Sequence, residues 1–253
     1  MKVVIVGAGN VATVLGRLIR QHGHQILQVV SRAAASAEIL AKELDCSFTD
    51  DSSLVDKSAD IYLIAVTDTA MAQLDERYSL GDKLVIHTAG SVSKDVLENI
   101  TTNYGVLYPL QSLRKQNMQL QQDIPLLIDA NTVEGFAVLQ DFAETISANV
   151  TKANDEERLK LHVAAVLVSN FTNHLYALAA DYCNKEGADF KLLLPLIEET
   201  ALRLRNYPPN EMRTGPAIRK DIHTLQKHLH LLWPYPAIHN MYLKMTDSIM
   251  NNP

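Results

Sequence analysis

The chain has 253 residues, of which 47% are hydrophobic and 21% charged, and its formal net charge is −6. This length suits two domains better than one, and the composition excludes a largely disordered or low-complexity chain. The negative charge argues against binding of nucleic acid, although it is compatible with a small anion in a locally basic pocket.

Cys46 and Cys183 have no neighbouring cysteine or histidine at metal-ligand spacing. We therefore expect neither a disulfide framework nor a metal site. The sequence shows no secretory pattern and no apolar run of about 20 residues, the length of a membrane span. These features predict a cytoplasmic protein without a membrane partner.

The chain opens with a predicted strand, a glycine turn and a helix. Residues 3–6 are all β-branched, a run typical of a strand buried in a parallel sheet. Apolar residues then recur at helical spacing between positions 11 and 19, and Gly23 follows as a stop.

The turn between them reads GAGNVA at residues 7–12 and matches the dinucleotide fingerprint in the expected context. Gly7 permits a tight turn, Gly9 lets the backbone approach a pyrophosphate, and Ala12 allows close packing of helix on strand. Asn10 and Val11 begin the helix, whose free N–H groups favour an anion. The alternative is a structural turn that binds nothing.

The second predicted strand, residues 26–30, ends in Ser31 and Arg32. An enzyme that uses NAD normally has an acidic residue near this point for the ribose hydroxyl. A hydroxyl and a guanidinium instead suit the 2′-phosphate of NADP, and the alternative is a solvated surface arginine.

Further strands alternate with helices. We predict strands at 59–66, 83–86, 105–108, 124–128 and 149–152, with a helix at 133–146. This alternation predicts an α/β fold with a doubly wound, mostly parallel Rossmann sheet.

Polar residues collect at the carboxyl ends of these strands, where ligands of such sheets bind. We expect the cofactor and substrate to meet Val66, Thr67, Asp68, His87, Thr88, Tyr108 and Gln111. His87 is a candidate for proton transfer because imidazole titrates near neutral pH. The alternative for His87 is a structural capping role.

From residue 154 the pattern is helical. We therefore expect an NADP-binding domain at 1–153 and a helical substrate or dimerisation domain at 154–253. The predicted helices cover 154–184, 189–206, 218–232 and 235–250. The middle of the first is apolar almost all round, which predicts a homodimer formed through these helices or burial within one chain.

The first of these helices carries His162, Asn170 and Asn173, which share one side of a regular α-helix. They are candidate catalytic residues that bind substrate or carry a proton. Alternatively, the amides are structural and are satisfied by neighbouring helices or a partner subunit. Arg213 and Arg219 flank Gly215-Pro216 and predict an anion-binding helix start, against the alternative of an ordinary solvated loop.

GAGNVA, Ser31-Arg32, HTAGSVSKDVL at 87–97, YPLQSL at 108–113 and TGPAIRKDIHTLQKHL at 214–229 resemble a known family. It comprises bacterial proteins, described as NADP oxidoreductases, that join a Rossmann-like domain to a helical domain of unknown function. The resemblance covers nearly the whole chain. The architecture is similar to pyrroline-5-carboxylate reductase, ketopantoate reductase and the β-hydroxyacid dehydrogenases.

The resemblance implies NADP but no particular substrate. In β-hydroxyacid dehydrogenases the long helix carries a catalytic lysine four residues before an asparagine. If Asn170 matches that asparagine, Val166 stands at the lysine position, and if Asn173 matches it, Ser169 does. The proton would then come from His87, His162 or a water held by Asn170.

These observations predict an NADP-dependent oxidoreductase that transfers a hydride between nicotinamide and a C=O or C=N bond of a small, carboxylate-bearing metabolite. The alternative is a non-catalytic NADP-binding sensor or interaction protein.

Overall fold

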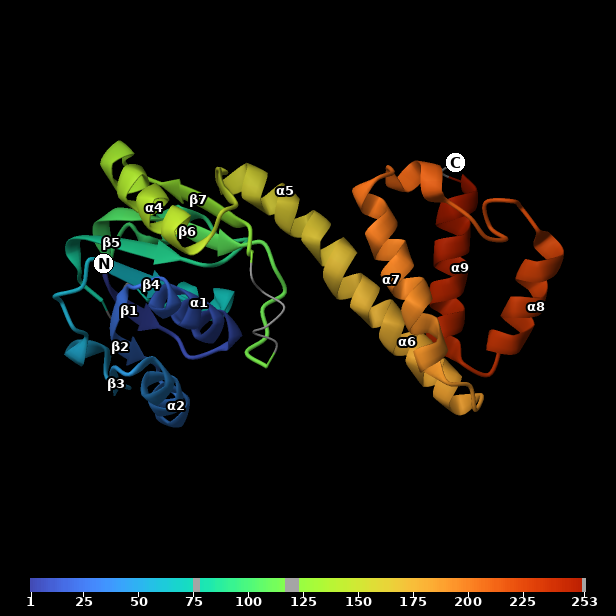
Figure 1. The fold of residues 1–253 in the computed structure, drawn as a ribbon, viewed down its shortest axis with the longest axis horizontal. Coiled ribbons are helices and arrows are strands. Elements are labelled where there is room, and N and C mark those ends of the chain that lie inside the picture. Colours follow the sequence, from blue (N-terminus) through green and yellow to red (C-terminus); the bar gives the residue numbers. More distant parts are fainter. Residues whose placement is uncertain (75–77, 117–122, 252–253) are drawn as a thin grey trace. The chain divides into compact units, whose positions relative to one another are not determined.

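The computed structural model describes residues 1–74, 78–116 and 123–251. The chain divides into two compact units, Met1–Leu167 and Val168–Pro253. The first holds all the strands found in the described residues, and the second is helical (Figure 1).

The first unit is built on one eight-stranded sheet with the order β3-β2-β1-β4-β5-β6-β7-β8. Only β6 and β7 pair antiparallel; the other neighbours are parallel. The strands are β1 (Lys2–Val6), β2 (Gln25–Val30), β3 (Ser47–Thr49), β4 (Ile61–Ile64), β5 (Gly81–His87), β6 (Thr101–Pro109), β7 (Leu126–Ala130) and β8 (Val150–Lys152). The predicted doubly wound, mostly parallel α/β fold is confirmed. Strand order reverses between β1 and β4, the place where such sheets bind ligands.

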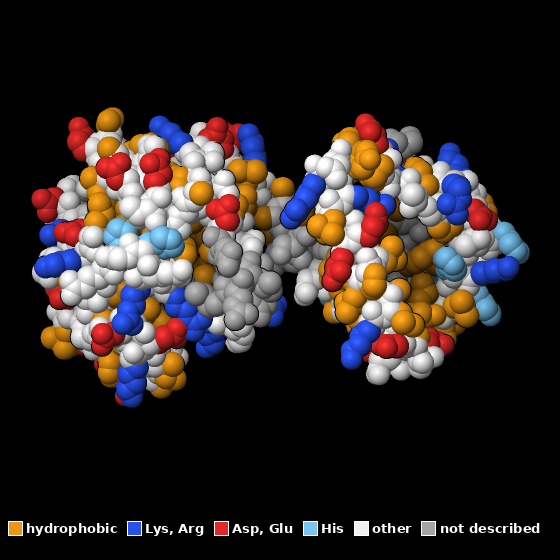
Figure 2. Space-filling model, viewed as in Figure 1, with side chains coloured by type: hydrophobic (Ala, Val, Ile, Leu, Met, Phe, Trp, Pro, Cys, Tyr) orange, Lys and Arg blue, Asp and Glu red, His pale blue; other side chains and the backbone are white. Residues whose placement is uncertain are grey.

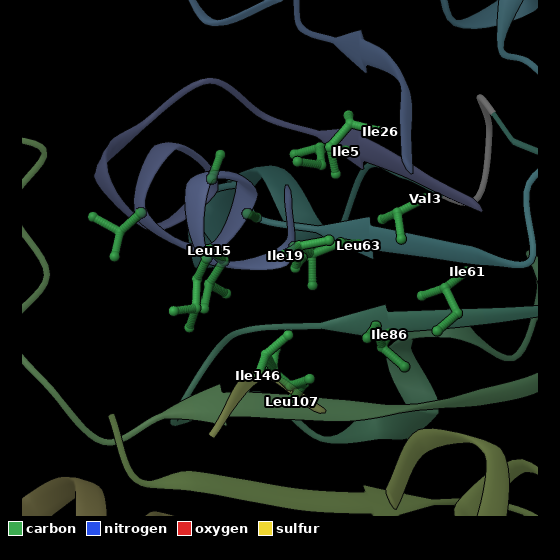
Figure 3. Close-up of a cluster of buried hydrophobic side chains, with 14 of the residues drawn as sticks. Val3, Ile5, Leu15, Ile19, Ile26, Ile61, Leu63, Ile86, Leu107 and Ile146 are labelled. Carbon is green, nitrogen blue, oxygen red and sulfur yellow. The ribbon is translucent and has the colours of Figure 1, made fainter. Parts of the chain in front are cut away.

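The sheet is covered on both faces. Val3 and Ile5 join a buried cluster with α1, α2 and α4, whereas Val4 and Val6 join a second cluster on the other face. Figure 3 shows Leu15 and Ile19 of α1 above the first face. The helices and 3₁₀ turns of this unit are α1 (Asn10–Gln21), α2 (Ala34–Leu44), η1 (Ser52–Leu54), α3 (Asp68–Met71), η2 (Lys94–Leu97), α4 (Val133–Ile146) and α5 (Asp155–Ala165).

The predicted helix at 154–184 is continuous, but its middle is not α-helical. After α5, the segment η4 (Val166–Phe171) is π-helical, and α6 (Thr172–Lys185) completes the helix. Asn154 caps it in a reciprocal capping box with Glu157. A π turn holds more residues than an α turn and shifts the faces beyond it. The angular positions of Asn170 and Asn173 relative to His162 therefore differ from those in a regular α-helix, and a shared ligand contact by these residues stays a prediction.

The remaining helices of the second unit are η5 (Phe190–Leu193), α7 (Leu194–Leu202), η6 (Arg203–Arg205), η7 (Pro209–Met212), α8 (Ile222–Leu232) and α9 (Pro236–Asn251). The prediction that the third helix starts at 218 is wrong, because the Asp221 carboxylate accepts the Thr224 backbone N–H and caps α8. Lys220 just before it is left-handed, with φ of 53°. Gly215-Pro216 therefore does not lie at a helix start, and the predicted anion cradle lacks a helix N-terminus.

The helix Asp155–Lys185 has 31 residues and a mean hydropathy of 1.3 in its most apolar window, enough by length and composition to cross a membrane. One such helix is weak evidence for a membrane span. Its first turns contact the sheet unit through Arg158 and His162. The remainder carries Asn170, Asn173 and Asp181, which are costly in a bilayer.

Candidate cofactor cleft and active site

The glycine turn after β1 has the shape that a dinucleotide requires. Gly7 has φ of 119°, and a Cβ there would lie 2.2 Å from the Ala65 carbonyl oxygen. Gly9 has open space where a side chain would stand and caps α1 without a side-chain hydrogen bond. The free N–H groups of the α1 N-terminus therefore face a space that can hold phosphate.

A first cavity of about 310 Å³ lies beside this turn. It is lined by predicted cofactor residues from the ends of β1, β2 and β4: Gly7, Gly9, Ser31, Arg32, Val66 and Thr67. The Arg32 side chain is exposed and forms no ion pair with any described residue. Its guanidinium is thus available to an anion in this cavity.

A second cavity of about 300 Å³ opens on the other side of the same turn. Its lining combines predicted cofactor residues with one predicted catalytic residue: Gly9, Asn10, Val11, Val66, Thr67, Asp68, Thr88 and His162, joined by Ala65, Ala89 and Gly90. The two cavities share Gly9, Ala65, Val66 and Thr67. The first therefore suits the adenosine end of a dinucleotide and the second the reacting end.

Asp68 is the charged group of the second cavity. The described lining contains one carboxylate and neither lysine nor arginine. Asp68 is exposed, and its Oδ2 accepts a hydrogen bond from Ser91 Oγ at 2.6 Å. This contact joins the segment after β4 to the segment after β5. It leaves the carboxylate as a fixed negative charge at the cavity edge.

His162 reaches the second cavity from α5 and pairs with Tyr108 at the end of β6. Tyr108 Oη and His162 Nδ1 share a hydrogen bond at 2.9 Å, and the rings meet edge to face. A Cβ on Gly90 would lie 2.6 Å from His162 Nδ1. Burial raises the pKa of Tyr108, against a smaller opposing effect of the Arg158 charge. The phenol therefore stays protonated at neutral pH.

His87 is enclosed rather than facing a cavity. Its side chain is 0% exposed, and it is not among the residues that line the two cavities. The Ala89 N–H donates to Nδ1 at 3.1 Å, so the neutral ring carries its proton on Nε2, which has no partner among the described residues. Burial and then the Arg158 charge lower the pKa of His87 to about 4. The ring is neutral at physiological pH.

The other predicted site residues are placed less directly. Ala12 is a buried residue of α1 within the core, as its packing role requires, and Gln111 is exposed after β6. The remaining four belong to the helical unit: Asn170, Asn173, Arg213 and Arg219. Asn170 and Asn173 are exposed there, and the Arg213 Nε–H donates to the Asn210 carbonyl. Ligand contacts by these residues stay predictions.

Two site features escaped sequence reasoning. The Tyr108–His162 pair joins residues 54 positions apart, which no local pattern connects. Arg158, 1% exposed, lies one turn before His162 and was not singled out. An arginine near the start of the predicted helix 154–184 was the available signal, but most arginines on helices are solvated.

Comparison with known proteins agrees with this geometry. Residues 2–90 match the family described as NADP oxidoreductase, coenzyme F420-dependent, and residues 124–249 match a domain of unknown function, DUF2520. A solved structure, "putative NADP oxidoreductase BF3122" from Bacteroides fragilis, is 38% identical, with a TM-score of 0.93 over 99% of this chain and 98% of that one. The chain belongs to the family that joins an NADP oxidoreductase Rossmann domain to a DUF2520 domain. The NADP-binding Rossmann class of the first unit is thereby confirmed.

More distant structures share the fold. A 1-pyrroline-5-carboxylate reductase from Streptococcus pyogenes is 14% identical, with a TM-score of 0.67 over 99% of this chain and 98% of that one. An imine reductase from Myxococcus stipitatus in complex with NADP⁺ is 16% identical, with a TM-score of 0.64 over 99% and 92%. A search of curated proteins gives no match.

Proposed function

We propose that this protein is an NADPH-dependent reductase that acts on the C=N bond of a small substrate bound at the second cavity. The observation that carries the proposal is the Tyr108–His162 hydrogen bond, because it holds in place an imidazole that lines the cavity beside the dinucleotide turn and can serve as a proton donor.

The residues fit NADP. Gly9 leaves open space for the pyrophosphate, and Ser31 and Arg32 suit the 2′-phosphate at the end of β2. When bound, the cofactor supplies the hydride. The remaining tasks of holding the substrate and managing a proton belong to the chain.

Asp68 favours C=N over C=O. A protonated C=N group is a cation, and hydride addition to it yields a neutral amine. A nearby carboxylate attracts such a substrate and holds it in the protonated form. The same charge would repel a substrate carboxylate from this edge of the cavity. Two distant structures of this fold also bear names that denote reduction of a C=N bond.

His162 and Tyr108 hold the proton. His162 lines the cavity, and its Nδ1 is fixed by the Tyr108 hydroxyl. A neutral imine that enters the site can take a proton from the imidazolium form of His162 before the hydride arrives, which leaves the ring neutral and still hydrogen-bonded to Tyr108. His87, which is enclosed and neutral, is not needed for this step.

We further propose that the protein forms a homodimer through its helical unit. This unit exposes large apolar side chains, and Figure 2 shows several on its surface. The exposed large apolar side chains of this unit include Phe171, Leu192, Leu196, Leu204, Trp233 and Met245. Exposed apolar surface of this kind favours burial against a second copy. Arg213 and Arg219 stay candidates for a substrate carboxylate, and we expect a cytoplasmic location.

The proposal is tested by following NADPH oxidation with a cyclic imine such as 1-pyrroline and with a matched panel of 2-oxo acids. We expect turnover of the imine, and we expect Asp68→Asn to raise its KM while leaving NADPH affinity within about threefold, since Asp68 lines the second cavity and not the first. Turnover of 2-oxo acids alone would overturn the C=N assignment. Tight NADPH binding without turnover of either class would favour a sensor.

A further inference from the structure

Arg158 of α5 is buried at a position where an apolar side chain would cost less free energy. Its side chain is 1% exposed, and neither Nε nor Nη1 has a hydrogen-bond partner among the described residues. Burying a guanidinium with two donors unsatisfied is unfavourable. An apolar side chain would fill this space at a lower cost. The buried charge of Arg158 and the hydrogen bond from its Nη2 therefore need an explanation.

The Nη2 group of Arg158 binds the segment that follows β5. Arg158 Nη2 donates to the Val92 carbonyl oxygen and forms an ion pair with Asp155 Oδ1 at 2.9 Å. Asp155 in turn accepts hydrogen bonds from Ser93 Oγ and the Lys94 backbone N–H. Asp155 and Arg158 thus fasten the first turn of α5 to residues 92–94.

The same face of α5 carries His162. Asp155, Arg158 and His162 are spaced by three and four residues, so they follow one another along one side of the helix. One turn after Arg158, His162 meets Gly90 and Tyr108. The segment that Arg158 grips at Val92 is therefore the segment that His162 contacts two residues earlier.

We propose that Arg158 is a positioning residue, whose hold on Val92 and Asp155 keeps His162 hydrogen-bonded to Tyr108 at the second cavity. Its importance for turnover rests on the proposed function, but its effect on the pair does not. The planar guanidinium matters because Nη2 has two N–H groups in fixed directions and meets a carbonyl and a carboxylate at once, which a lysine ammonium does with less directional control.

The test is an NMR measurement of the His162 ring nitrogens in the full-length protein. Tyr108→Phe gives the reference position for a broken pair, and His162→Gln identifies the resonance. Arg158→Met removes the contacts with Val92 and Asp155, and Arg158→Lys keeps the charge without the planar guanidinium. The matched control is Arg17→Met, because Arg17 likewise joins a carboxylate, that of Glu43, to a backbone carbonyl, that of Lys115.

We expect Arg158→Met to move the His162 Nδ1 resonance most of the way to the Tyr108→Phe position, Arg158→Lys to move it less, and Arg17→Met to leave it unchanged. If Arg158→Met does not fold, Asp155→Asn and Arg158→Lys decide, and both must shift the resonance in the same direction. A folded Arg158→Met protein, or a folded pair of these substitutes, with His162 at its wild-type position would overturn the proposal.

A second readout separates this inference from the proposed function. With an imine that the wild-type protein reduces, Arg158→Met should lower kcat while the KM for NADPH stays within a small factor. If the wild-type protein reduces no imine, the proposed function fails, yet the NMR comparison still decides whether Arg158 positions the pair.

Discussion

Tyr108 and His162 join the end of strand β6 to the third turn of helix α5 through a hydrogen bond of 2.9 Å. His162 of this pair lines the cavity that Gly9, Thr67 and Asp68 also line. The strand ends of a Rossmann sheet and helix α5, which lies within the DUF2520 match, thus contribute to one site within the first unit.

Removing either partner of the pair should slow the chemical step. We expect Tyr108→Phe and His162→Gln to lower kcat by about 100-fold, the usual contribution of a positioned acid, while the dissociation constant for NADPH changes little. Single-turnover kinetics with NADPH and an imine measure the step directly. An unchanged hydride-transfer rate in both variants would show that the proton comes from elsewhere.

Gly90 should tolerate no side chain. In Gly90→Ala the new methyl would stand 2.6 Å from His162 Nδ1 and 2.9 Å from Tyr108 Cζ, which forces the two rings apart. We expect a loss of activity comparable to that of Tyr108→Phe with a small change in melting temperature. A crystal structure of this variant with the Tyr108–His162 distance unchanged would contradict the prediction.

The two glycines of the turn should separate stability from binding. Gly7→Ala places a methyl 2.2 Å from the Ala65 carbonyl oxygen at a φ of 119°, so we expect a loss on the order of 3 kcal/mol in the free energy of unfolding. Gly9→Ala meets no atom within 4 Å and should cost about 1 kcal/mol or less. It should nevertheless weaken NADPH binding by roughly tenfold or more, because the methyl occupies the space for pyrophosphate. Urea unfolding and fluorescence titration test both halves, and equal effects of the two changes on stability would count against this account of the turn.

Arg32 should decide the choice between NADPH and NADH. Loss of a charge-assisted contact worth about 1.5–3 kcal/mol predicts that Arg32→Ala weakens NADPH binding by roughly 10- to 100-fold and leaves NADH binding nearly unchanged. Arg20→Ala, a change at the opposite end of α1 from the turn, serves as the control. Equal affinity of the wild-type protein for the two cofactors would remove the case for a 2′-phosphate site.

His87 should make the fold sensitive to mild acid. Its pKa is lowered from 6.5 to about 4 in the folded protein. Between these values the unfolded chain binds more protons, so the free energy of unfolding falls as the pH decreases from 6.5 to 4, by on the order of 3 kcal/mol. His87→Asn keeps an acceptor for the Ala89 N–H and should flatten this dependence. The measurement is urea unfolding across this pH range, and identical slopes in the two proteins would refute the assignment.

The fold and the cofactor half of the site were predictable because their signals are local. The run at residues 3–6, the glycine turn and the polar strand ends each depend on neighbours in sequence, and topology then brings strand ends together. Short β3 and the early start of β6 at Thr101 lacked such a pattern. A three-residue edge strand is defined by its partner rather than by its own residues.

The reacting half depends on contacts between distant segments. The sequence proposed both His87 and His162, but it could not show that one ring is enclosed while the other reaches a cavity. Nor could it show a π-helical segment at 166–171, since π turns have no reliable sequence pattern. Because this segment changes the angular spacing along the helix, regular helical geometry alone does not relate Asn170 and Asn173 to His162.

The central claim is that the Tyr108–His162 pair lies at the reacting end of a bound cofactor. A crystal structure of the protein with NADP⁺ tests it most directly. We predict the 2′-phosphate at Ser31 and Arg32, the pyrophosphate at Gly9, and the nicotinamide ring in the second cavity, in contact with His162. A nicotinamide ring bound away from His162 and Asp68 would contradict the account.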